Sequence, residues 1–131
     1  NQHRAILFET ALHGELLNLD EEDNKRHYAG GMSANRINAG LGTIISQLLE
    51  ICGRDKIAGL YTTGGDTMVN VCYQLGVECI EVMDYVIAQT DIGRLVGSYD
   101  GLPIVGKGGL TGNDHTACDI VDRLFREAAR K

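Results

Sequence analysis

The stretch Leu60-Tyr61-Thr62-Thr63-Gly64-Gly65-Asp66-Thr67 decides how this sequence folds. An apolar run typical of a buried strand gives way to paired glycines, then to Asp66 and Thr67, and then to residues with helical spacing. The same order returns in Lys107-Gly108-Gly109-Leu110-Thr111-Gly112-Asn113-Asp114. Both stretches therefore predict a turn from a strand into a helix, as in α/β proteins.

Glycine turns at the start of a helix can bind anions. Glycine lets the backbone approach a ligand closely, and the first N–H groups of the helix lack intrahelical partners and lie at the positive end of its dipole. Such turns also occur simply as short connections between a strand and a helix. From spacing alone, the phosphate-binding and the purely structural interpretations are balanced.

Two familiar nucleotide motifs do not fit these loops. A P-loop, G-x-x-x-x-G-K-[ST], needs Ser or Thr after its lysine, whereas Lys107 is followed by Gly108. The dinucleotide fingerprint G-x-G-x-x-G fails because Gly106 and Gly108 are followed by Thr111 where the third glycine should stand. Any phosphate site here is of another type, at the carboxyl ends of two strands, where open α/β sheets bind ligands.

Composition limits the classes of function. A chain of 131 residues with 44% hydrophobic content fits one domain, residues 1–131. The net charge of -6 disfavours nucleic acid and anionic membranes as general partners. The four cysteines lack any C-x-x-C spacing, which disfavours a metal site or a disulfide framework and predicts buried, reduced thiols in a cytoplasmic protein.

The apolar pattern predicts strands at Ala5–Phe8, Ile57–Tyr61 and 77–83, the last partly exposed because of its glutamates. Two further strands, 92–97 and 102–105, flank an Asp-Gly turn and predict a hairpin in which the only proline begins a strand. The fold expected is an α/β three-layer sandwich, in which helices flank a mixed, mainly parallel sheet that includes a C-terminal hairpin and helix.

Three helices are expected. The first runs over 33–52 with Ser33 as N-cap, and its apolar face should pack on the sheet; that face contains Ile37, Leu41, Ile44, Ile45, Leu48 and Cys52. Gly40 and Gly42 inside it suggest a close approach to the sheet. The second starts at Asp66 or Thr67, and the third at 113 or 114. The charged segment 20–26 is expected to be a solvated loop or a helical turn.

The glycine stretches together with Leu75-Gly76-Val77 and the run 102–112 resemble the C-terminal nucleotide-binding domain of the four-carbon acid sugar kinases, over about residues 57 to 127. The resemblance implies that an N-terminal domain of a longer protein holds a sugar acid such as threonate, erythronate or a 3-oxo-tetronate. The C-terminal domain would hold ATP with Mg²⁺ and present the γ-phosphate to the terminal hydroxyl. The fragment alone is then expected to be inactive.

Carried over by motif, the resemblance implies nine nucleotide-binding residues: Thr63, Gly64, Gly65, Asp66, Thr67, Lys107, Gly108, Gly109 and Gly112. The sequence departs from the family in lacking its glycine-serine segment before Ala5, and in reading Gly-Gly-Leu-Thr-Gly where many members have Gly-Asn-Phe-Gly. Lys107 could neutralise phosphate oxygens or cover the sheet end with its stem. Asp66 could hold Mg²⁺ or a ribose hydroxyl, or cap its helix.

Two classes of function remain open at this point. One is the ATP-binding domain of a kinase, in which positioning and charge neutralisation lower the barrier. The other is a stand-alone domain that binds an anionic ligand or regulates another protein without catalysis. A homo-oligomer is compatible with either class.

Overall fold

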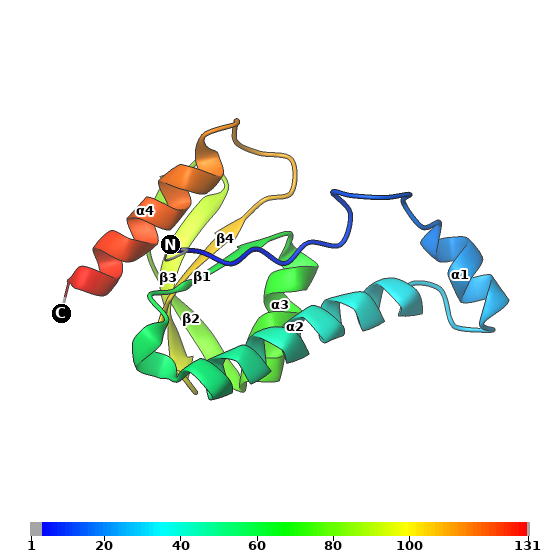
Figure 1. The fold of residues 1–131 in the computed structure, drawn as a ribbon, viewed down its shortest axis with the longest axis horizontal. Coiled ribbons are helices and arrows are strands. Elements are labelled where there is room, and N and C mark those ends of the chain that lie inside the picture. The colour runs from blue at the N-terminus through cyan, green and yellow to red at the C-terminus, as the bar shows by residue number, and fades with distance from the viewer. Residues whose placement is uncertain (1–3, 131) are drawn as a thin grey trace.

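Residues 4–130 are described by the computed structural model in Figure 1. Its helices and strands, in chain order, are α1 (Leu19–Lys25), α2 (Met32–Cys52), the 3-10 helix η1 (Arg54–Lys56), β1 (Leu60–Thr63), α3 (Gly65–Leu75), β2 (Val77–Ile87), β3 (Thr90–Gly97), β4 (Pro103–Lys107) and α4 (Thr116–Ala129). None of the helices within residues 4–130 has the length and apolar character needed to cross a membrane.

The four strands form one mixed sheet in the order β1-β4-β3-β2. The predicted hairpin is confirmed as β3 and β4, and Pro103 begins β4. Only β1 and β4 are parallel, because tight turns before and after β3 make its two pairings antiparallel. The sheet is therefore mixed as expected but not mainly parallel.

Apolar side chains fill both faces of the sheet, which gives the predicted three-layer sandwich. On one face, Leu49 of α2 and Val71 of α3 pack with Ile104 of β4. On the other face, Ile120 and Leu124 of α4 pack with the next residue of β4, Val105. The alternation of neighbouring β4 residues between the two cores is the period of two expected of a strand covered on both faces.

The segment Ala5–Phe8 does not form the predicted strand. It is extended but unpaired, with Ile6 69% and Leu7 73% exposed. A strand needs a partner for its backbone groups, and among residues 4–130 the strand β1 pairs only with β4. The apolar run therefore predicted the extended conformation but not the pairing. The third predicted strand does form, as β2, which extends to Ile87 at the expected sheet edge.

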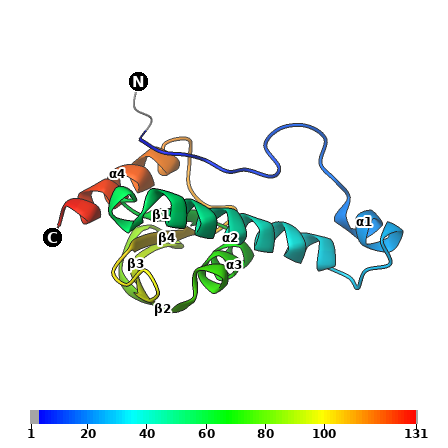
Figure 2. The ribbon, with the colours of Figure 1, turned by 60° about the horizontal axis from the view of Figure 1, so that its bottom comes forward.

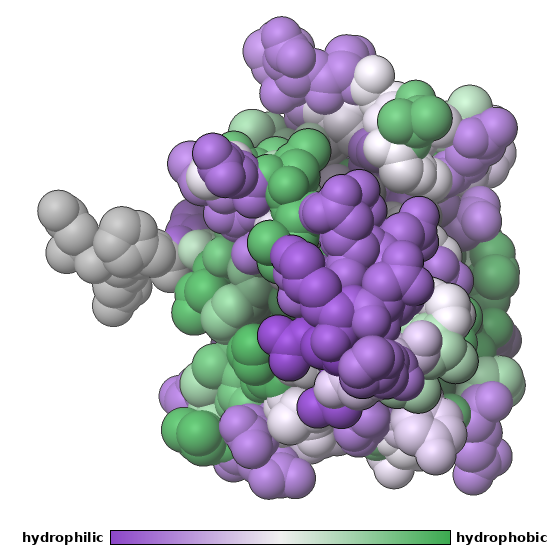
Figure 3. Space-filling model, turned by 90° about the vertical axis from the view of Figure 1, so that its right-hand side faces the viewer, coloured by the Kyte–Doolittle hydropathy of each residue, from purple (hydrophilic) through white to green (hydrophobic). Residues whose placement is uncertain are grey.

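The acidic segment forms the short helix α1, whose hydrophilic side chains occupy the middle of the face seen in Figure 3. Buried Asp23 of α1 accepts hydrogen bonds from the backbone N–H groups of Gly31 and Ser33, each at 2.7 Å. Gly31 is the N-cap of α2, with φ 85°, and Ser33 lies inside the helix. The predicted cap at Ser33 is therefore wrong, because a carboxylate from α1 caps α2 from outside.

The orientation of α2 also differs from the prediction. Its buried residues are Gly42 and Leu49, whereas Ile37 and Ile44 of the predicted core face are exposed. A Cβ at Gly42 would lie 2.7 Å from Gln74 Cγ and 2.8 Å from the carbonyl oxygen of Asn70, both on α3. The close approach therefore joins two helices and not a helix and the sheet, and it fixes the rotation of α2.

The cysteines are free, but three of them are not buried. Cys52, Cys79 and Cys118 are exposed, and Cys72 is half-buried. Desolvation raises the pKa of the Cys72 thiol above its usual value. The prediction of unpaired thiols is confirmed, whereas the prediction that they are buried is wrong for the other three.

Candidate functional site

The two glycine loops lie next to each other at one edge of the sheet. They follow β1 and β4, which are neighbouring parallel strands with Thr63 opposite Lys107. The N–H of Gly64 donates to the carbonyl oxygen of Lys107 at 3.0 Å. The carboxyl ends of the two strands, and the starts of the two following segments, therefore face the same side, as the sequence predicts.

The first loop is one glycine long before the helix begins. Gly64 is the N-cap of α3 with φ 90° and no side-chain capping bond, so Asp66 and Thr67 lie inside the first turn. The capping role predicted for these two residues is wrong, since a glycine with positive φ makes the turn. The Asp66 carboxylate is exposed and has no hydrogen-bond partner among residues 4–130. The Thr67 hydroxyl donates to Asn38 Oδ1 of α2 at 2.9 Å.

The start of α3 has free backbone donors. The first N–H to bond along the helix is that of Met68, to the carbonyl oxygen of Gly64 at 3.2 Å. The N–H groups of Gly65, Asp66 and Thr67 precede it and have no backbone acceptor within the described part of the chain. A Cβ at Gly65 would meet nothing within 4 Å, so the space in front of these donors is open.

The second loop is held against the β2–β3 turn. The N–H of Gly108 donates to the carbonyl oxygen of Gln89 at 3.0 Å, and the Thr111 hydroxyl donates to the carbonyl oxygen of Gly108 at 3.1 Å. Gly109 is exposed, and a Cβ there would also meet open space. Gly112 is different: it has φ 97°, and a Cβ would lie 2.6 Å from Thr116 Oγ1. Gly109 therefore leaves room for a ligand, and Gly112 makes the turn.

Lys107 places its charge at the second loop. Its Nζ donates to the carbonyl oxygen of Gly108 at 2.6 Å, and the side chain is half-buried. The ammonium therefore stays within the site and does not extend into water. The stem covers the sheet end, so the two uses weighed for this residue are compatible in one conformation.

Helix α4 begins later than predicted, at Thr116 in place of 113 or 114. The Thr116 hydroxyl accepts from the N–H of Asn113 at 2.8 Å, and Asn113 Oδ1 accepts from the N–H of His115 at 2.9 Å. These bonds use Asn113 to close the loop before the helix starts. The exposed His115 occupies the N-cap position without a side-chain capping bond.

Sequence reasoning missed two residues that support the loops. Asn38 is bonded to Thr67, and Gln89 lies beside Gly108, with its Oε1 3.4 Å from where a Gly108 Cβ would be. Both come from elements distant in the chain. A polar Asn38 within an apolar helix pattern was the one available signal, whereas nothing in the sequence around Gln89 pointed to the site.

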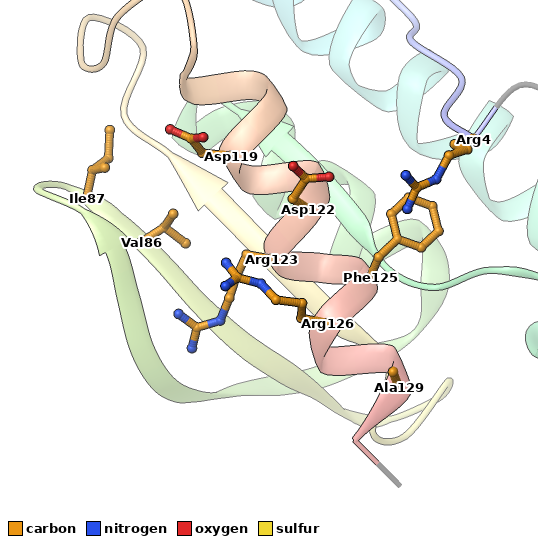
Figure 4. Close-up of a pocket in the computed structure, with 9 residues that line it drawn as sticks. All are labelled: Arg4, Val86, Ile87, Asp119, Asp122, Arg123, Phe125, Arg126 and Ala129. Atoms are coloured by element: carbon orange, nitrogen blue, oxygen red, sulfur yellow. The ribbon is translucent and has the colours of Figure 1, made fainter.

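The hollow drawn in Figure 4 lies away from the glycine loops, between α4 and the end of β2, with a volume of about 720 Å³. The Arg123 guanidinium donates to Asp84 at 3.0 Å and to Glu127 at 3.2 Å, and Arg4 stacks on the Phe125 ring at 4.4 Å. The Tyr85 N–H and Arg123 lower the pKa of Asp84, which in turn raises the pKa of Arg123. These charges are already paired, so the hollow is not the predicted phosphate site.

Comparison with known proteins gives sequence relatives. A family model described as the nucleotide-binding C-terminal domain matches residues 1–117. The chain is 39% identical over 99 residues to D-erythronate kinase of Heliobacterium modesticaldum, which covers 75% of this chain and 22% of that protein. It is 31% identical over 123 residues to D-threonate kinase of Salmonella typhimurium, covering 92% of this chain and 28% of that protein.

Two solved structures are also similar. Both are crystal structures of a domain of unknown function from Bordetella bronchiseptica, described as domain-swapped dimers with bound citrate. Each has a TM-score of 0.65 and 28% sequence identity, covering 76% of this chain and 25% or 24% of the solved chain. The chain thus spans about a quarter of the length of the relatives that it matches.

Proposed function

Because the chain belongs to the family of nucleotide-binding C-terminal domains, we propose that it is the ATP-binding domain of a kinase that phosphorylates the terminal hydroxyl of a four-carbon sugar acid. The kinase class is supported by the erythronate and threonate kinases that it resembles. Residues 1–131 would act as one nucleotide-binding domain, and a threonate, erythronate or 3-oxo-tetronate would be held by another part of a longer protein.

One observation carries this proposal: two open glycine loops share one sheet edge. The bond from Gly64 to Lys107 joins them, and neither Gly65 nor Gly109 has an atom where a side chain would begin. A phosphate chain needs this kind of space, because its oxygens must come within hydrogen-bond distance of backbone N–H groups. The loops therefore fit the triphosphate of ATP.

The chain's own residues would bind and orient the nucleotide. The N–H groups of Gly65, Asp66 and Thr67 would donate to phosphate oxygens at the positive end of the α3 dipole. Lys107, already turned toward the second loop, would neutralise one oxygen as a point charge. The exposed Asp66 carboxylate would ligate the Mg²⁺ that accompanies ATP or bond a ribose hydroxyl. ATP supplies the phosphoryl group that is transferred.

The surroundings of the site favour phosphate over base recognition. Tyr61, the aromatic residue nearest in sequence to the first loop, packs against the core formed with α4, and its desolvation raises its pKa. It is therefore committed to the core and not free to stack on adenine. We also propose a cytoplasmic location, which is supported by free and largely exposed cysteines that suit a reducing compartment.

An NMR titration of the purified chain with Mg²⁺-ATP tests the site directly. The expected result is a set of saturable amide shifts that is largest at Gly65, Asp66 and Gly109. The amide of Val82, on the exposed edge strand, is the internal control and should not shift. Saturable shifts confined to the hollow around Arg123, or none at all, would contradict the proposed site.

The proposal also predicts that the chain does not turn over alone. With threonate, erythronate or a 3-oxo-tetronate present, the purified chain should release no ADP beyond the rate without the sugar acid. Steady ADP production that depends on the sugar acid would show that these residues hold the substrate as well.

A further inference from the structure

Helix α2 carries a second apolar face in addition to the one that packs on α3. Its residues follow the 4-3-4-3 spacing of the a and d positions of a coiled coil. This α2 stripe consists of Ile37, Leu41, Ile44, Leu48 and Ile51. Its three isoleucines are exposed to 37%, 41% and 83%, in chain order. Two heptads of core-type residues are thus left in water.

The stripe is not a displaced core. Gly42 and Leu49 point to the opposite side of the helix, where they are buried and where Gly42 allows the close approach of α3. The rotation of α2 is therefore fixed by good packing, and turning the stripe inward would lose that contact. Something outside the sandwich must cover the stripe if it is to be buried.

The N-terminal arm, residues 4–18, borders the stripe at both ends. Near one end, Ile6 and Phe8 line an apolar hollow of about 350 Å³ together with Leu48. Near the other end, Leu17 and Ile37 line a second hollow. Figure 2 shows the arm running along the helix between these points. The arm adds further exposed apolar side chains, namely Leu7, Leu12 and Leu16.

We propose that a second copy of this chain covers this surface, with the two α2 helices packed antiparallel along their stripes. The stripe is centred on Ile44, so a two-fold axis at this residue would place Ile37 of one copy opposite Ile51 of the other. A regular stripe on a helix is self-complementary in such an arrangement.

Charge on the flank of the stripe favours the antiparallel orientation. Arg36 lies near one end of this flank and Glu50 near the other, 14 positions apart along the helix. An antiparallel pair would bring Arg36 of each copy to the end that carries Glu50 of the other. A parallel pair would bring like charges together within the roughly 10 Å over which surface charges act.

The size of the surface explains why the arm belongs to it. From Ile37 to Ile51 the stripe is about 21 Å long, at about 1.5 Å per residue. A helix pair of that length buries less than the roughly 800 Å² per partner of a stable interface. The exposed leucines of the arm supply the remaining apolar area, so the dimer should need the arm as well as α2.

Sedimentation velocity over a range of concentrations tests the proposal on the whole chain. The unmodified chain should show a monomer–dimer equilibrium. Ile44→Glu, at the centre of the stripe, should weaken the dimer by at least about tenfold, because it places two carboxylates at the two-fold axis. The matched control is Val82→Glu, which puts the same charge on an equally apolar, 65% exposed position of β2 and should leave the equilibrium unchanged.

Two outcomes would overturn the dimer: a chain that is monomeric at all concentrations, or one whose association survives Ile44→Glu while circular dichroism shows the fold intact. The orientation has its own test. Glu50→Arg alone should weaken the dimer, and adding Arg36→Glu should restore it. An unrestored double variant would rule out the antiparallel pairing.

Discussion

The backbone N–H of Gly64 donates to the carbonyl oxygen of Lys107 at 3.0 Å, which joins the ends of β1 and β4. These residues are 43 positions apart in the chain, yet this bond sets the distance between the two glycine loops. Because the loops are already held side by side, a phosphate chain would bind without first having to order them. The affinity of the site should therefore depend on the loops as one unit.

Glycines 109 and 112 should respond differently to the same substitution. Gly109→Ala should leave stability unchanged, since the position is open and lacks positive φ, but it should weaken ATP binding by obstructing close approach. Gly112→Ala should destabilise the fold by about 1–3 kcal/mol, because alanine is strained at φ 97° and would contact Thr116 Oγ1 at 2.6 Å. Urea denaturation and calorimetric titration of both variants check this. Equal stability losses would contradict the assigned roles.

Replacing Lys107 by methionine tests its charge. The variant keeps most of the stem over the sheet end but loses the ammonium that now bonds to Gly108. ATP affinity should fall by on the order of 1–3 kcal/mol, because a charged hydrogen bond to phosphate is lost. Lys56→Met, on the 3-10 helix before β1, is the control and should bind ATP normally. Unchanged affinity in Lys107→Met would mean that the ammonium does not meet phosphate.

Glu127 should be a key residue for stability. Its buried carboxylate lies 2.8 Å from Arg130, 3.2 Å from Arg123 and 3.7 Å from Arg94, so it links α4 to β3. Glu127→Gln should lower the free energy of unfolding by about 3 kcal/mol, since buried guanidinium groups would lose their counter-charge. Arg130→Gln removes a largely exposed partner and should cost less than about 1 kcal/mol. Urea titrations of the two variants measure the difference, and similar losses would contradict it.

The cap of α2 should depend on pH. Hydrogen bonds from the Ser33 side chain and from the backbone N–H groups of Ser33 and Gly31 lower the pKa of Asp23. A carboxyl whose folded pKa is depressed stabilises the fold above its unfolded pKa of about 4, and this contribution is lost as pH falls through the folded value. Hydrogen exchange in α1 should therefore quicken below about pH 4.

The matched variants of this pH experiment are Asp23→Asn and Asp20→Asn. Asp23→Asn should show fast α1 exchange already at neutral pH, with little further change in acid. Asp20 is an exposed neighbour on the same helix and should leave the pH profile unchanged. Slow exchange in acidified unmodified chain would contradict the role of Asp23.

The loops could be predicted because their information is local. Paired glycines after an apolar run specify a strand-to-helix turn, and two such turns on parallel neighbours must share a sheet edge. The hairpin was equally local, since Asp100-Gly101 marks its turn. What lay beyond local pattern was the partner of each element.

Three errors have that common cause. Ala5–Phe8 had strand composition but no neighbour to pair with. Ser33 had cap chemistry, but Asp23 reached the helix end first. The apolar face of α2 was read as core, but a close contact at Gly42 turned the helix onto α3. Periodicity identifies an apolar face and does not say which surface will cover it.

Calorimetric titration of the purified chain with ATP, ADP and adenosine in the presence of Mg²⁺ tests the central claim most directly. The loops offer N–H groups and one lysine to phosphate, while Tyr61 is committed to the core, so affinity should follow the number of phosphates. The predicted order is ATP tightest, then ADP, with adenosine weakest. Adenosine binding as tightly as ATP, or no binding of ATP, would contradict the account and assign the glycine loops a purely structural role.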